Sequence, residues 1–197
     1  AKKQGFQVII SVTKNDLLDF RRTTVTIIAG DKHDIISITQ LYSVPTPEEE
    51  TKIKVTGGEA SSQETTSDDN KFANSFDGDY NSIWHTNWNE GDKYPYTITY
   101  YLEETDQLNY IIYYPRFDGG SNGRFGQIEI QAQSRLSDEF VKVMDYDCGK
   151  KGSESKIMFE NPVLNPKSIR FIIKSGEGGH ASCAEMEFYR GTGKDIQ

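Results

Sequence analysis

The sequence has no apolar run that approaches the roughly 20 residues a membrane-spanning helix needs. It also lacks an opening stretch with the basic and apolar regions of a signal peptide. Basic residues are also few: the chain has 22 Lys and Arg but 30 Asp and Glu, which gives a net charge of -8 and a pI near 5.0. Proteins that bind nucleic acid through its phosphates present a basic surface. We therefore expect neither nucleic acid as a partner nor membrane insertion.

Cysteine is scarce. Cys148 and Cys183 are far apart and form no C-x-x-C pair, which disfavours zinc and redox motifs. A chain of 197 residues can build a core without a disulfide. At this point the two cysteines can be either free or bridged.

Hydrophobic residues alternate with a period of two along much of the chain, which is typical of β-strands. FQVIISV and the two runs around a turn at Gly30 and Asp31 predict at least three antiparallel strands. One helical turn is expected in DNKFANSF at 69–76. Six further strands are predicted, at 96–102, 108–114, 127–133, 140–146, 168–174 and 185–189. Short strands separated by turn residues favour an all-β chain with a β-sandwich of the jelly-roll type.

Prolines and glutamates gather in VPTPEEET at 44–51, a composition typical of a stiff, solvated linker. We place the domain boundary there. Residues 1–43 would form a β piece too short for a complete sandwich of about 100 residues. Residues 52–191 would form the main domain, and 192–197 a tail.

Both tryptophans and one of the three histidines lie in SIWHTNW at 82–88. Trp84 is expected to point into the core because it sits within an apolar run. Trp88 could instead present a flat surface beside His85.

Sugars carry an apolar face of C–H groups and a rim of hydroxyls, so an exposed aromatic ring with polar neighbours suits them. Trp88, His85, Arg116 and Asn122 would make such a set. The alternative is that both tryptophans fill the core and Arg116 forms a salt bridge at a strand end.

Oxygen-bearing side chains gather just before the tryptophans. Asp77, Asp79 and Ser82 lie within six residues around the turn-former Gly78. Calcium takes several oxygen ligands from side chains and backbone carbonyls. The spacing is not that of an EF-hand, and Asp-Gly turns are common without metals, so both readings stay open here.

Four motifs in order resemble the discoidin, or coagulation-factor type C, domain, and within it the family 32 carbohydrate-binding modules. They are ASS at 60–62, FDGDYNSIWHTNW at 76–88, YYPRFDGGSNG at 113–123 and GGHASCAEMEFY at 178–189. The similarity runs from about Lys54 to Arg190. It implies a galactose-binding-like β-sandwich that binds sugars and is not an enzyme.

The resemblance implies a structural calcium ion. In such modules its ligands come from the loop around the DG aspartate and from an Ala-Glu pair near the C-terminus. The matching positions here are Asn74 (by its backbone carbonyl), Asp77, Asp79, Ser82, Ala184 and Glu185. Calcium would then join the 74–82 loop to the last strand.

The resemblance also implies a sugar site. Family members read the hydroxyls of galactose-type sugars with a His, an Arg and an Asn and stack the ring on an aromatic. The matching positions are His85, Arg116, Asn122 and, for some members, Trp88. An axial 4-hydroxyl leaves one ring face unusually apolar, so stacking plus a polar contact to that hydroxyl selects galacto-configured sugars. We expect terminal galactose or N-acetylgalactosamine.

Two positions depart from the family pattern. Other members add an aromatic from the last loop, but here SGEGGHASC at 175–183 offers only His180. Family members also recruit a polar contact from the first loop, for which Gln63 and Glu64 are candidates. We name Glu64 as the sugar contact.

The N-terminal piece, through Arg22–Ile27 and Ile36–Gln40, resembles the closing strands of BACON-type immunoglobulin-like repeats in gut Bacteroidetes proteins. Together the resemblances imply a monomeric module of a secreted, periplasmic or cell-surface bacterial protein. We expect it to target a glycosidase or a mucin-acting peptidase in the same polypeptide.

Two other classes of function fit the sequence less well. Catalysis would need a matched acid and base, and His85 could pair with nearby acids, but those acids are better explained as metal ligands. A discoidin-type adhesion module that binds protein or phospholipid is the main alternative. Lipid-binding members expose apolar spikes and basic rims, whereas these loops are rich in Asp, Asn, Ser and Gly.

Overall fold

The structure is a computed structural model that describes residues 21–40, 49–89 and 93–193. The chain divides into two compact units, Ala1–Pro45 and Thr46–Gln197. The division falls inside the linker predicted at 44–51. Thr51, at the end of that linker, is the first residue of a strand of the second unit.

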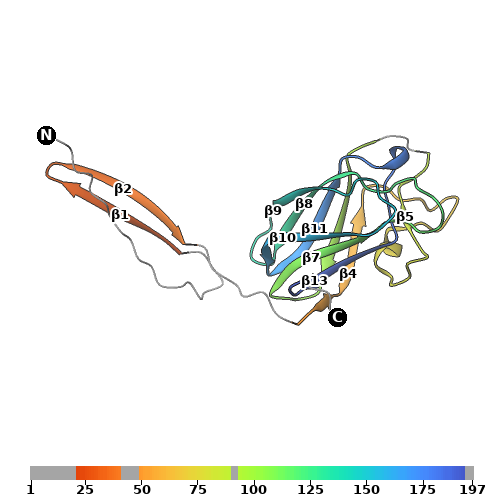
Figure 1. Ribbon diagram of the computed structural model, residues 1–197, viewed down its shortest axis with the longest axis horizontal. Coiled ribbons are helices and arrows are strands. Elements are labelled where there is room, and N and C mark those ends of the chain that lie inside the picture. The colour runs from red at the N-terminus through yellow and green to blue at the C-terminus, as the bar shows by residue number, and fades with distance from the viewer. Residues whose placement is uncertain (1–20, 41–48, 90–92, 194–197) are drawn as a thin grey trace. The chain divides into compact units, whose positions relative to one another are not determined.

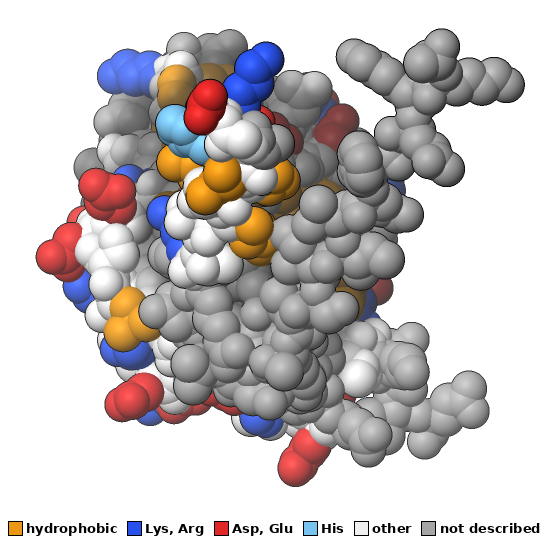
Figure 2. Space-filling view, turned by 90° about the vertical axis from the view of Figure 1, so that its left-hand side faces the viewer, with side chains coloured by type: hydrophobic (Ala, Val, Ile, Leu, Met, Phe, Trp, Pro, Cys, Tyr) orange, Lys and Arg blue, Asp and Glu red, His pale blue; other side chains and the backbone are white. Residues whose placement is uncertain are grey.

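The first unit contains a β-hairpin. Strands β1 (Arg21–Ala29) and β2 (Lys32–Gln40) pair antiparallel, and Gly30 makes the turn with a φ of +62°, a conformation that favours glycine. Hydrophobic side chains of the hairpin reach the surface (Figure 2), and Ile28 and Ile35 are 73% and 59% exposed. The strand predicted in FQVIISV lies outside the described residues, and the immunoglobulin-like assignment stays a prediction.

The second unit is a β-sandwich (Figure 1). One sheet has the order β10-β7-β13-β3, formed by Ser155–Leu164, Gln107–Tyr114, Glu185–Arg190 and Thr51–Ile53. The other has the order β4-β6-β11-β8-β9, formed by Val55–Ala60, Tyr96–Leu102, Pro166–Ile173, Gln127–Ser134 and Phe140–Asp147. All of these strand pairs are antiparallel. The all-β sandwich predicted from the alternation is confirmed.

The core lies between the two sheets and is rich in aromatic rings. Tyr100 of β6, Phe171 of β11 and Phe188 of β13 are completely buried and in contact, with ring centroids 5.2–6.5 Å apart. Alternation places every second residue of these strands inward. Burying one large apolar side chain contributes about 1.5–3 kcal/mol, so this shared layer is a main source of stability.

Six predicted strands of the second unit are present as β6, β7, β8, β9, β11 and β13, with ends shifted by at most two residues. The helical turn predicted in DNKFANSF is the 3₁₀ turn η1 (Phe72–Phe76). The long strand β10 was not predicted. Its pairing with β7 shifts register between Met158 and Val163, and such a bulge interrupts the alternation that marks a strand.

Both cysteines are buried and free. Burial raises the pKa of the Cys148 thiol to about 12, so this thiol is protonated at neutral pH and unreactive. Among the described residues, no helix has the length and apolar character needed to cross a membrane.

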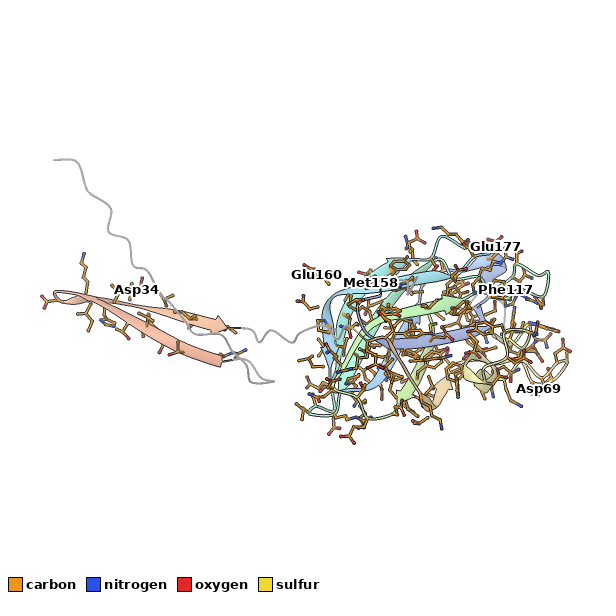
Figure 3. All side chains as sticks on the ribbon, turned by 60° about the horizontal axis from the view of Figure 1, so that its bottom comes forward. Asp34, Asp69, Phe117, Met158, Glu160 and Glu177 are labelled. Carbon is orange, nitrogen blue, oxygen red and sulfur yellow. The ribbon has the colours of Figure 1, made fainter. Side chains whose placement is uncertain are left out.

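A short ladder draws the functional loops together at one end of the sandwich. Strands β5 (Trp84–His85) and β12 (Ser182–Cys183) pair antiparallel, with His85 opposite Ser182. Figure 3 shows Asp69, Phe117 and Glu177 at this end, away from Glu160 at the other. Loops that are far apart in sequence therefore meet beside β5.

Candidate functional site

The first group at the loop end is centred on His85 of β5. Its side chain is 1% exposed, and burial lowers its pKa, so the imidazole is neutral at pH 7. Its Nδ1 lies 2.6 Å from the Thr86 carbonyl oxygen. A carbonyl can only accept, so this contact requires the proton on Nδ1. Nε2 then carries the lone pair that a ligand hydroxyl can use.

Trp88 stands beside His85 and is 41% exposed. The two rings meet edge to face, with centroids 6.0 Å apart. The indole Nε1 lies 3.0 Å from the same Nδ1 that contacts Thr86. One nitrogen cannot serve both neighbours, and the shorter contact to Thr86 decides the tautomer. Trp84, by contrast, is fully buried and donates from Nε1 to the Ser62 carbonyl, which confirms its predicted inward direction.

Arg116, in the loop after β7, is clamped by Asp118. Its Nε and Nη2 donate to the two carboxylate oxygens of Asp118 at 2.7 and 2.5 Å, a bidentate pair with fixed geometry. The guanidinium holds the pKa of Asp118 below its usual range. Nη1 makes only a 3.4 Å contact, to the Asn122 carbonyl. That nitrogen is the one best placed to meet a ligand.

Gly120 makes room for this clamp. A Cβ at Gly120 would lie 2.6 Å from Cζ of Arg116. A side chain at position 120 would therefore displace the guanidinium from its present position.

Asn122 is exposed and links this loop to the last one. Its carbonyl accepts from the Ser182 hydroxyl at 3.0 Å. Its side chain covers Gly178, where a Cβ would lie 2.5 Å from Asn122 Oδ1. His180, in the last loop, stacks at a tilt on His85 with ring centroids 5.2 Å apart. We call His85, Trp88, Arg116, Asn122 and His180 the sugar group.

Phe117 was not singled out as a candidate from the sequence. It is 49% exposed at the loop end (Figure 3), next to the clamped Arg116. An aromatic residue directly after the loop arginine was the signal that could have identified it.

Glu64 does not face a ligand. It is fully buried, and its Oε1 accepts hydrogen bonds from the Thr66 hydroxyl and from the Thr66 and Ser67 backbones. Its Oε2 accepts from the Trp88 backbone at 3.2 Å. The hydrogen bonds from Thr66 and Ser67 lower the pKa of Glu64 to about 2. Glu64 holds the loop that carries Trp88, so we no longer propose it as a sugar contact.

The second group contains the predicted calcium ligands. Oγ of Ser82 lies 2.9 Å from Asp77 Oδ2, 3.0 Å from the Asp79 carbonyl and 3.2 Å from the Asn74 carbonyl. Four oxygens from one loop thus converge, as a hard cation requires. The Asp79 carboxylate turns away and accepts from Asn81, so Asp79 would contribute its carbonyl.

Glu185 of β13 reaches the same loop. Its Oε1 accepts from the Gly78 backbone at 2.7 Å, and burial raises the pKa of Glu185 to about 7. Ala184, beside it, donates its N–H to the Tyr114 carbonyl. Within the described part of the chain, no three His, Cys, Asp or Glu side chains are placed to hold a metal. Carbonyls and a hydroxyl would have to complete the coordination, which suits calcium better than zinc.

Comparisons with known proteins identify the family of the chain. The model of the F5/8 type C domain matches residues 58–186, which is most of the chain. The chain belongs to the F5/8 type C domain family. The match contains all members of the sugar group and every predicted calcium ligand.

Solved structures similar to this F5/8 type C domain are family 32 carbohydrate-binding modules. The module of NanJ from C. perfringens, in complex with galactose, is 26% identical with a TM-score of 0.64, and the match covers 72% of this chain and 99% of that one. The Clostridium perfringens module CpGH89CBM32-5, in complex with GalNAc-β-1,3-galactose, is 27% identical with a TM-score of 0.60, covering 67% and 93%. The domain thus shares the fold of family 32 carbohydrate-binding modules.

One curated relative is an enzyme, the A type blood N-acetyl-α-D-galactosamine deacetylase of Flavonifractor plautii. It is 27% identical over 119 residues, which are 59% of this chain. The chain spans only 15% of the length of that relative.

Proposed function

We propose that this module binds terminal galactose or N-acetylgalactosamine on glycans, without catalysis, at the sugar group. The observation that carries the proposal is the neutral, buried His85, whose Nδ1 contact with the Thr86 carbonyl leaves the acceptor lone pair on Nε2. The axial 4-hydroxyl of a galacto-configured sugar would donate to Nε2 and accept from Arg116 Nη1. Asn122 would bind a neighbouring hydroxyl, and Trp88 would cover the apolar ring face.

The similar modules support this choice of sugar, since one is in complex with galactose and another with GalNAc-β-1,3-galactose. A single site of this kind binds weakly, and linkage to other binding modules raises the overall affinity for a glycan. We propose that the natural context is a secreted or cell-surface bacterial enzyme acting on glycans. The deacetylase relative supports a larger parent polypeptide, because this chain spans only 15% of its length.

We propose calcium as the structural cofactor, held by Asp77, Glu185, Ser82 and the carbonyls of Asn74 and Asp79, with the Ala184 carbonyl as a further ligand. Bound there, the ion supplies positive charge that offsets the two carboxylates and ties the 74–82 loop to β13. In this role it would fix the loop next to β5 and take no part in sugar chemistry.

The test is a glycan array probed with the tagged chain in calcium. Signal is expected on glycans that end in galactose or N-acetylgalactosamine, and His85→Ala should lose at least tenfold of it. The matched control is His33→Ala, because His33 is an exposed histidine of the hairpin. Normal sugar binding by a folded His85→Ala protein would refute the site.

The adhesion alternative rests on one observation, the exposed Phe117, which directly follows Arg116 in the loop after β7. A lipid-binding loop pairs apolar side chains with free basic ones, but the Arg116 guanidinium is paired with Asp118. Sedimentation with phosphatidylserine liposomes decides between the two. Co-sedimentation that Phe117→Ser removes, with no signal on the array, would favour adhesion.

A further inference from the structure

An open hollow of about 800 Å³ adjoins the sugar group. Trp88 and Arg116 belong to both, so they form the shared wall. The rest of its lining comes from the 68–74 segment, Asp77, Asn81–Ile83 and Asp118, and it includes the proposed calcium ligands Asn74, Asp77 and Ser82. A ligand bound at His85 and extending past Trp88 would enter this hollow.

The hollow has a distinct charge pattern. It contains two cations, and both are paired within it: Lys71 with Asp69 at 3.0 Å and Arg116 with Asp118. Asp68 adds a further carboxylate, whereas the charge of Asp77 would be offset by the proposed calcium ion. Among the described residues of the hollow, an anionic group would therefore meet one carboxylate in excess and no cation that is not already paired with a carboxylate.

The hydrogen-bonding groups in the hollow suit the hydroxyls of an uncharged ligand better than an anionic group. Asn70 and Asn81 line it with amide side chains, and carboxylates are strong acceptors for O–H donors. Pockets of roughly 300–1,000 Å³ hold drug-sized ligands, so a sugar residue beyond the terminal one fits easily. The apolar part of the lining includes Ile83 and Trp88.

We propose that the hollow is a second subsite that binds the penultimate sugar of an uncharged glycan and disfavours sulfated or sialylated ones. The inference rests on the proposed binding of the terminal sugar by His85. The penultimate sugar lies past Trp88 and Arg116, against the 68–74 segment. Affinity then depends on glycan length as well as on the terminal residue.

Titration calorimetry of the full chain tests this with three ligands: methyl β-galactoside, a neutral oligosaccharide ending in β-galactose, and the same oligosaccharide sulfated on its second sugar. The neutral oligosaccharide should bind at least fivefold more tightly than methyl β-galactoside. The sulfated one should lose that gain.

Two variants locate the effect. Ala73 is exposed and lines the hollow, so Ala73→Tyr should fill it and remove the oligosaccharide gain without changing the Kd of methyl β-galactoside. Leu136→Tyr, at a site 79% exposed and outside the hollow, is the control. Asp68→Lys, which adds a cation to the hollow, should improve binding of the sulfated ligand relative to the neutral one.

The outcomes are separable. If methyl β-galactoside binds but the neutral oligosaccharide binds no better, or if Ala73→Tyr leaves the gain intact, the second subsite is refuted and the terminal site stands. Tighter binding of the sulfated ligand by the unmodified chain would refute the charge selection. If no ligand binds, the proposed function falls first, and the subsite with it.

Discussion

Arg116 is held in place by two residues that need not touch a sugar. Asp118 binds two of its nitrogens, and Gly120 gives the guanidinium space against the loop. A guanidinium fixed in this way loses little freedom when a ligand binds, so more of the hydrogen-bond energy appears as affinity.

The first prediction concerns Gly120→Ala. The added Cβ would lie 2.6–2.8 Å from the Arg116 guanidinium, so the side chain must leave the Asp118 clamp. We expect binding of methyl β-galactoside to weaken at least tenfold, about 1.4 kcal/mol, with little change in melting temperature. Titration calorimetry and thermal unfolding measure the two quantities.

The control for this change is Gly57→Ala, where the new Cβ would make an ordinary 3.6 Å contact with Tyr101. It should leave both quantities unchanged. Undiminished affinity in Gly120→Ala would show that the clamp does not matter for binding.

The second prediction uses the two tryptophans as reporters. Trp84 is fully buried, whereas Trp88 is 41% exposed. A sugar that covers Trp88 should shift the emission to shorter wavelength and protect part of it from acrylamide quenching. Trp88→Phe should abolish the change although Trp84 still emits, and a change that survives this substitution would place the sugar elsewhere.

At the scale of elements, the ladder of β5 and β12 has only two residues on each side, yet it organises the site. Thr86 donates its backbone N–H to Ala181, and Ser182 donates its own to Gly123. These bonds join the first, middle and last loops, and the hydrogen bond from the Gly78 N–H to Glu185 adds a further link between the 74–82 loop and β13. The loops can therefore be positioned without long secondary structure of their own.

The third prediction concerns that link. Calcium at 100 times its Kd should stabilise the fold by about 2.7 kcal/mol, which is roughly 5–10 °C in melting temperature for a domain of this size. Removing calcium with EDTA should lower the melting temperature by that amount. Asp77→Ala should lower it similarly and make it insensitive to EDTA.

Asp138→Ala is the control, because the Asp138 side chain is fully exposed and far from this loop in sequence. It should keep the full EDTA effect. If EDTA leaves the unmodified chain unchanged, the calcium proposal is wrong and the oxygen cluster is a hydrogen-bonded turn.

At the scale of the whole molecule, the described parts of the two units differ in how far their apolar side chains are buried. The second has a closed aromatic core between two sheets. The first shows, in its described part, one hairpin with exposed isoleucines, and an isolated hairpin is marginally stable. Binding and stability should therefore reside in the second unit.

The fourth prediction follows from this division. Residues 46–197 expressed alone should fold cooperatively, with a melting temperature within a few degrees of the full chain, and should bind methyl β-galactoside with a Kd within twofold. Circular dichroism and titration calorimetry check both. A fragment that unfolds or loses affinity would show that the first unit supports the site.

Some features of this protein could be determined from the sequence. The alternation in 96–102 and 168–174 predicted two central strands, because side chains on a strand point to opposite faces regardless of what lies beyond it. Trp84 was correctly placed in the core. The order of the four motifs identified the family and with it the segments from which a site could be built.

Other features were decided by tertiary contacts. Glu64 was expected to contact the sugar, but it is buried and its carboxylate accepts hydrogen bonds from Thr66, Ser67 and Trp88. The interrupted strand β10 was recognisable only from its pairing with β7. The clamp on Arg116 and the hollow beside Trp88 depend on distances between loops. Alternation is a local property of the chain, whereas burial, hydrogen-bond partners and cavities arise only when distant segments pack together.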